Sequence, residues 1–276
     1  MSATVASVSR TELFKQFRRP RTYTAYGLLV LIPTIMTIAL KANPPDSGRE
    51  GFLVQLASRS GLYVPAFALR FTSEFLLVIV VAIFGGEAIA GEAQWGNLRY
   101  LLMRPIARWR LFAGKFIVAV VASLGAVSAV VLAGLVAGGI AFGLNPIEFP
   151  FSFGFFESLS TGQVLLRLLF ATVFVAWTLT SVVAFSFLVG CMTDSTGGAI
   201  FAGIGLWLTW SILDAIESIG RIRYFFPTHW SGSWVQIFGR DGFNDDLWRC
   251  ALLTLGYVVV FLAIGAWYFR RKDVTS

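Results

Sequence analysis

Apolar side chains fill six long runs of the chain without alternating with polar ones, and short polar segments separate the runs. A helix that crosses a membrane needs about 20 mostly apolar residues, whereas a strand of a membrane barrel alternates apolar and polar positions. The pattern therefore predicts an all-α, polytopic membrane protein with six transmembrane helices and no strands. We expect these helices near residues 23–40, 66–86, 112–142, 164–190, 197–213 and 251–269.

The composition supports a membrane protein and argues against a soluble one. Hydrophobic residues make up 57% of the 276 residues. Charged residues make up only 13%, against about 25% in ordinary soluble domains. In water such a chain would expose large apolar patches. Because the apolar runs extend along the whole chain, we expect residues 1–276 to form a single transmembrane domain.

The basic residues predict the orientation of the chain. With a cytoplasmic N-terminus, the cytoplasmic segments hold 13 basic and five acidic residues, and the opposite segments hold nine basic and ten acidic ones. Lys and Arg collect on the cytoplasmic side of membrane proteins. We therefore expect a multi-pass protein of the cell inner (plasma) membrane with both termini cytoplasmic. The net charge of +7 fits loops that face anionic lipid, and without a soluble basic domain we expect no nucleic-acid partner.

Two segments outside the apolar runs have patterns of their own. Residues 10–20 place Leu13, Phe14 and Phe17 on one helical face among cations, which predicts an amphipathic N-terminal interfacial helix. That helix is either a plain anchor or an elbow that transmits motion from a cytoplasmic partner. Residues 218–249 are aromatic and interrupted by a proline and glycines, which predicts re-entrant outer helices before the last span.

The second run contains two charges, Arg70 and Glu74, which lie four residues apart and therefore on one helical face. Charges inside a membrane helix usually face protein or water. Two interpretations stay open for this pair. Either it snorkels to water at the outer surface, or it lines an outward-facing cavity.

Glycine and cysteine positions add two smaller predictions. Gly134 and Gly138 form a G-x-x-x-G pattern in the third run, a spacing that permits close helix contact. Cys191 and Cys250 fall at ends of runs that the predicted topology places on opposite membrane faces. We therefore expect no disulfide between them.

Patterns for catalysis or metal binding are missing from the sequence. Its one histidine, His229, cannot build a centre of several histidines, and we assign it a structural role. The sequence contains neither a G-x-x-x-x-G-K-[ST] phosphate loop nor a G-x-S-x-G motif. We therefore expect no catalytic residues, no metal and no cofactor in this chain, and no hydrolysis of ATP by it.

The segment between the second and third runs is compact and charged. Residues 91–115 have the sequence GEAQWGNLRYLLMRPIARWRLFAGK, with five basic residues and two tryptophans. It resembles the cytoplasmic loop of ATP-binding-cassette exporter permeases of the ABC-2 type. Such loops run from an acid through a small-residue turn and leucines to Pro-x-x-Arg and Gly-Lys. The matching residues are Glu92, Gly96, Leu98, Leu101, Leu102, Pro105, Arg108, Gly114 and Lys115.

The resemblance extends to the plan of the whole chain, and it departs from the family mildly at one point. The family often has Gly-Thr where this chain has Gly96 and Asn97. The resemblance implies a permease subunit that forms a substrate pathway as a homo- or heterodimer in membrane lipid. Separate ABC ATPase subunits would bind ATP and Mg, and the loop at 90–111 would dock on them as a coupling helix.

The resemblance also implies roles for particular residues. On a helix, the three- and four-residue spacings place several loop residues on one docking face. The ATPase-coupling residues would be Glu92, Trp95, Gly96, Leu98, Arg99 and Leu102. In the family, spans two and five face the dimer axis, so the pathway candidates are Phe71, Glu74, Trp207, Trp210 and Asp214.

Two alternatives remain at this point. The loop at 90–111 is, in the simpler interpretation, only a positive loop that faces lipid. The protein as a whole is alternatively an ATP-independent transporter or channel. A secondary transporter is expected to hold ionisable residues near the middle of the membrane, whereas the charges here cluster at span ends.

Overall fold

The computed structural model describes residues 5–18, 20–44, 52–94, 107–146, 159–239 and 244–271. Within these ranges every regular element is a helix and none is a strand. Six helices are long and apolar enough to cross a membrane, which confirms the predicted number. They are α2 (Pro20–Ala42), α5 (Leu76–Gln94), α7 (Arg108–Phe142), α8 (Thr161–Met192), α9 (Thr196–Ala215) and α11 (Asp245–Arg271).

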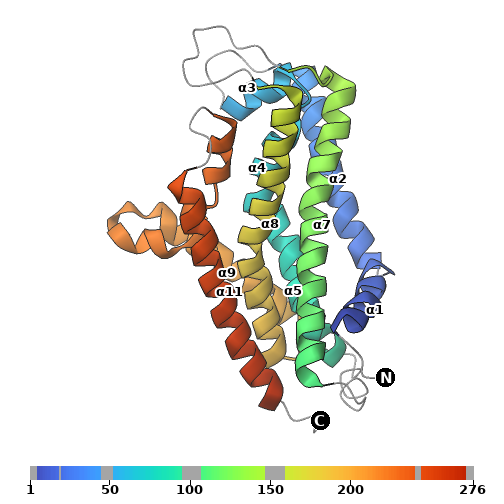
Figure 1. Cartoon of the computed structure of the whole chain (residues 1–276), viewed down its shortest axis with the longest axis vertical. Helices are drawn as coiled ribbons and strands as arrows, with labels where there is room; N and C mark the ends of the chain where they lie inside the picture. The colour runs from blue at the N-terminus through green and yellow to red at the C-terminus, as the bar shows by residue number, and fades with distance from the viewer. Residues whose placement is uncertain are drawn as a thin grey trace.

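Shorter helices complete this bundle. They are α1 (Val5–Arg18), α3 (Phe52–Arg59), α4 (Val64–Glu74), the 3-10 helices η1 (Glu217–Phe225) and η2 (Ser233–Phe238), and α10 (Pro227–Trp230). Of these, α1 lies at one end of the bundle, α3 at the other and α4 between the long helices (Figure 1). The helix α1 lies at the end of the bundle where α7 begins and α11 finishes. A hydrogen bond of 3.0 Å from Arg108 to the carbonyl of Arg270 joins those last two helices. We call this the terminal end and the opposite one the distal end.

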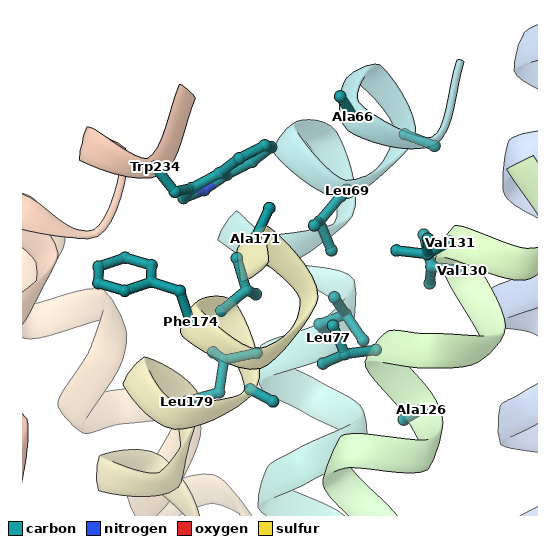
Figure 2. Close-up of a cluster of buried hydrophobic side chains, with 14 of the residues drawn as sticks. Ala66, Leu69, Leu77, Ala126, Val130, Val131, Ala171, Phe174, Leu179 and Trp234 are labelled. Atoms are coloured by element: carbon teal, nitrogen blue, oxygen red, sulfur yellow. The ribbon is translucent and has the colours of Figure 1, made fainter. Parts of the chain in front are cut away.

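The helices α5 and α8 form the centre of the bundle, and α2, α9 and α11 are the least buried of the six. Figure 2 shows the core that α5 and α8 build with α4, α7 and η2. Leu69, Leu77, Val130, Phe174 and Trp234 converge in it. Lipid tails are as apolar as leucine, so the tight fit of these side chains, and not their removal from water, holds such a core together.

The second predicted span, 66–86, falls across two helices, which corrects the expectation of one continuous helix there. Phe75 separates α4 from α5, with a φ of −134° and a ψ of −60° that leave the helical region. Helices usually break at Pro or Gly, and neither stands at this position. The membrane-length helix of this region is instead α5, which runs eight residues beyond the predicted end.

The glycines of the third run make the close contact that their spacing predicts. A Cβ atom on Gly138 would lie 2.6 Å from the carbonyl oxygen of Gly61, and one on Gly134 would lie 2.8 Å from the Cα of Pro65. Their partner is therefore the turn that leads into α4. Only glycine lets α7 approach this turn so closely.

Neither cysteine forms a disulfide in the described part of the chain, and both are fully buried. Cys250 lies 3.6 Å from the hydroxyl of Thr178 on α8. Cys191 lies on the same helix 13 residues further along, or about 20 Å at 1.5 Å per residue. Further along both helices, Phe185 of α8 contacts Phe261 of α11, so the two helices run in the same direction. Cys191 therefore lies far along the bundle from Cys250.

Candidate functional site

Three charged side chains meet at the terminal end, exactly where the chain leaves α5 and enters α7. We call Glu12, Glu92 and Lys115 the root cluster. The Lys115 Nζ atom lies 2.7 Å from the Glu92 carboxylate and 3.3 Å from that of Glu12. It also donates a hydrogen bond of 2.9 Å to the carbonyl oxygen of Ala88. The cluster thus joins α1, α5 and α7 through one ammonium group.

Because the root cluster is buried, the stability of the fold is sensitive to substitution of any of its three residues. The side chain of Lys115 is 3% exposed, and those of Glu92 and Glu12 are 7% and 11% exposed. Glu92 approaches Lys115 as an ion pair whose angle does not suit a hydrogen bond. Charges this far from water must be compensated locally, and removing one partner strongly destabilises the rest. Lys15 adds a second cation 2.9 Å from Glu12, so two positive charges face two negative ones.

Further contacts tie the ends of the neighbouring helices together. Arg21 at the start of α2 pairs with the buried Glu87 of α5 at 2.7 Å. The Thr196 hydroxyl donates a hydrogen bond of 2.6 Å to Gln94, which joins the end of α5 to the start of α9. With the contacts of Lys115 to α1 and of Arg108 to α11, the helices on either side of the segment between α5 and α7 are therefore fixed to α1, α2, α9 and α11.

Glu12 gives the docking of α1 a dependence on pH. Burial alone would raise the pKa of Glu12, but Lys115 and Lys15 outweigh it, so the pKa lies below the ordinary value of 4.5. A carboxyl with a lowered pKa in the folded state contributes stability above its ordinary pKa and loses it as pH falls through the lowered one. The contribution of Glu12 is therefore complete above pH 4.5 and disappears below it.

We predict that Glu12→Gln lowers the free energy of unfolding by about 1 kcal/mol at neutral pH, because it removes charge-assisted bonds to two lysines. The difference from wild type should shrink as pH falls below 4.5. Thermal unfolding of both proteins in detergent across this range provides the measurement. Glu217→Gln, at an exposed carboxyl on η1, is the control. A difference that stays constant down to strong acid contradicts the prediction.

The predicted ATPase-coupling residues divide into two groups. Glu92 lies in α5, with its carboxylate on Lys115 inside the bundle. The other five lie outside the described residues, so their role as a docking face stays a prediction: Trp95, Gly96, Leu98, Arg99 and Leu102.

Two of the predicted pathway residues lie on one exposed face of α4. Phe71 is 67% exposed, and Glu74 is exposed and paired with Arg70. Arg70 and Glu74 line a small pocket, and its other walls include Thr178 of α8, Trp207 of α9 and a serine beyond α10. Thr178 lies near the middle of α8, which spans residues 161–192. The charged pair therefore lies level with Thr178 of α8, on an exposed face of α4.

Trp207 lines the same pocket as Glu74, whereas Trp210 and Asp214 make separate contacts. Trp207 and Trp210 are almost fully buried, and the ring of Trp210 lies 4.8 Å from that of Tyr257 on α11. Asp214 binds His229 at 2.6 Å and Arg223 at 3.3 Å. It thereby attaches η1 and α10 to the end of α9. His229 thus contacts Asp214, and its structural role stays a prediction.

Sequence reasoning did not find Glu12 or Arg167 as important residues. Arg167 donates hydrogen bonds of 2.6 and 3.3 Å to the carbonyls of Ile237 and Gly239, and thus holds η2 on α8. Arg167 and Lys115 are each the only charge in a long apolar run. A lone charge in such a run usually faces protein, and this signal identifies both positions. No signal in the sequence pairs Glu12 with them.

The described part of the chain holds no group of three or more His, Cys, Asp or Glu side chains that could bind a metal ion. Residues 26–275 match the model of one family, whose description is "Protein of unknown function (DUF2705)". No curated protein matches the chain.

Proposed function

The chain belongs to the DUF2705 family, and we propose that it is the transmembrane permease subunit of an ATP-driven exporter of the ABC-2 type. The root cluster is the observation that carries this proposal. The two charged residues that bracket the motif of residues 91–115, Glu92 and Lys115, bind each other inside the bundle. Their contact gives that segment a rigid base on which a partner could push.

In this proposal the segment 95–106 docks on a separate ATPase subunit, which binds ATP and Mg. Closure of two ATPase subunits displaces the segment. Because Lys115 holds α1, α5 and α7 together, the displacement reaches all three helices at once. The helix α1 then acts as an elbow in the cytoplasmic interface, with both termini in the cytoplasm.

The pathway would form where two such subunits meet. The α4 face with Phe71, Arg70 and Glu74 is exposed in the single chain although it lies beside the middle of α8. Charged side chains on membrane helices usually face protein or water. A second permease subunit, identical or related, would cover this face and place the charged pair at the pathway.

The test replaces Leu98 and Leu102 together by aspartate. If these side chains fill an apolar groove of the ATPase, two charges there should abolish binding, since an unpaired buried charge is strongly unfavourable. We expect the double variant to insert normally but to lose its ATPase on co-purification and to stop transporting. Leu144→Asp, at a half-exposed leucine beyond the distal end of α7, is the control and should keep both.

Retention of the ATPase at wild-type stoichiometry by Leu98→Asp/Leu102→Asp, together with transport, would overturn the proposed docking face. The segment would then be a positive loop that faces lipid. A further requirement is that the purified chain alone does not hydrolyse ATP.

One observation favours a second candidate function, an ATP-independent transporter or channel. The Arg70–Glu74 pair lines a small pocket together with Thr178 and Trp207, and a secondary transporter uses ionisable residues that face such a cavity. Reconstitution of the chain alone in vesicles separates the two candidates. Solute flux without any ATPase subunit supports the second candidate, and flux that requires the ATPase and ATP supports the first.

A further inference from the structure

A lateral projection on the bundle encloses a large apolar groove. We call residues Glu217–Trp230, which form η1 and α10, the flange, and Figure 1 shows it in orange projecting sideways beside α11. Asp214 ties the flange to α9, and the Tyr257 hydroxyl donates a hydrogen bond of 3.1 Å to the carbonyl of Phe225. The groove between flange and α11 has a volume of about 980 Å³.

The flange wall of the groove is aromatic, and the α11 wall combines aliphatic residues with Tyr257 and Phe261. Tyr224, Phe225 and Trp230 of the flange face Leu252, Gly256 and Val260 of α11. A Cβ atom on Gly256 would meet no other atom within 4 Å, so this glycine leaves the groove open without supporting any helix contact. Tyr224 and Phe225 are each more than half exposed, so the groove opens toward the surroundings of the bundle.

A single cation stands at the distal end of the groove. Arg249 lines the groove, and its guanidinium lies 5.3 Å from the ring centre of Trp230. Among the described residues, the acid that pairs with it is Asp246, 3.6 Å away, and the Arg249 side chain is 60% exposed. The guanidinium therefore keeps donors free for a further anion, and arginine binds phosphate oxygens in a bidentate manner.

The length of the groove matches one leaflet of a bilayer. Arg249 and Val260 are eleven residues apart on α11, or about 16 Å along a helix axis. Half of the ~30 Å apolar core of a membrane is about 15 Å. A lipid whose phosphate lies at Arg249 would therefore have the end of its acyl chain near Val260.

We infer that the groove binds one phospholipid of the leaflet at the distal end of the bundle. The phosphate accepts hydrogen bonds from Arg249, and one acyl chain lies along Leu252, Gly256 and Val260 beneath the aromatic rings of the flange. A second protein chain fits less well, because a groove of one-leaflet length with one cation at its end matches the charge and shape of a lipid. This site is independent of the proposed transport function.

The test uses the full-length chain, purified in mild detergent and delipidated. Native mass spectrometry then measures binding of dioleoyl phosphatidylglycerol. We expect Arg249→Gln and Gly256→Leu each to weaken binding at least tenfold, the first by removing the phosphate donor and the second by filling the acyl groove. Arg221→Gln, at an exposed arginine of the flange that does not line the groove, should bind as wild type does.

Two related ligands identify which part of the lipid is recognised. Dioleoylglycerol, which lacks the phosphate, should bind weakly and equally to wild type and Arg249→Gln. Glycerol phosphate, which lacks the chains, should not bind. Equal phosphatidylglycerol binding by wild type and by Arg249→Gln and Gly256→Leu would overturn the inference. Disulfide-linked dimers of Gly256→Cys in membranes would overturn it too, because a second copy would then occupy the groove.

Discussion

Replacing Lys115 by methionine is expected to destabilise the folded chain by about 3–5 kcal/mol, because it leaves the buried carboxylate of Glu92 without its cation. Glu92 has no other cation within ion-pair distance among the described residues. Methionine keeps the length of the side chain, so lost charge and not lost volume should dominate. Equilibrium unfolding in mixed micelles measures the difference from wild type.

Two further variants show whether the ion pair causes this loss. Lys41→Met removes an exposed lysine at the end of α2 and should change the stability by less than about 0.5 kcal/mol. Combining Lys115→Met with Glu92→Leu should recover much of the loss, since apolar pairs can replace buried ion pairs. If the double variant is as unstable as Lys115→Met alone, the charge of Glu92 is not the cause.

The second large effect is expected at the contact between α7 and the turn before α4. Gly138→Ala should destabilise the chain by about 1–3 kcal/mol, because its Cβ would lie 2.6 Å from the Gly61 carbonyl oxygen. The atom it meets belongs to the backbone, so a change of rotamer cannot relieve the clash. Thermal unfolding in detergent measures this effect.

The matched control for Gly138→Ala has the opposite expected sign. Gly205 lies in α9, and a Cβ there would meet nothing within 4 Å. Gly205→Ala should therefore be neutral or stabilise by up to about 1 kcal/mol through the higher helix propensity of alanine. Equal effects of the two substitutions would show that the close approach at Gly138 does not matter for stability.

The helical spans were predictable because lipid requires long apolar helices, and the sequence displays their length directly. The break at Phe75 was not predictable, because no Pro or Gly marks it. Tertiary contacts of α4 with α7 decide where that helix lies, and such contacts are invisible in a hydropathy pattern.

The candidate site was predictable only in part. Glu92 and Lys115 both stand out in the sequence as the charges that bracket the segment 91–115. Their contact with Glu12 depends on how α1 folds back on α7, which no local pattern encodes. Asp214 was predicted to line a pathway, but an acid at a span end is equally suited to bind His229. Residue type alone does not separate those two roles.

The burial of both cysteines means that thiol-reactive labels can be directed to cysteines introduced elsewhere in the chain. Cys191 and Cys250 have no exposed surface, so water-soluble maleimides should leave the unaltered protein unlabelled. A cysteine introduced on the surface should then be the one site that such a reagent labels, so Cys191 and Cys250 need not be removed first. Pairs of spin labels or fluorophores at the two ends of α7 can thus test whether the protein opens and closes as the proposed transport function requires.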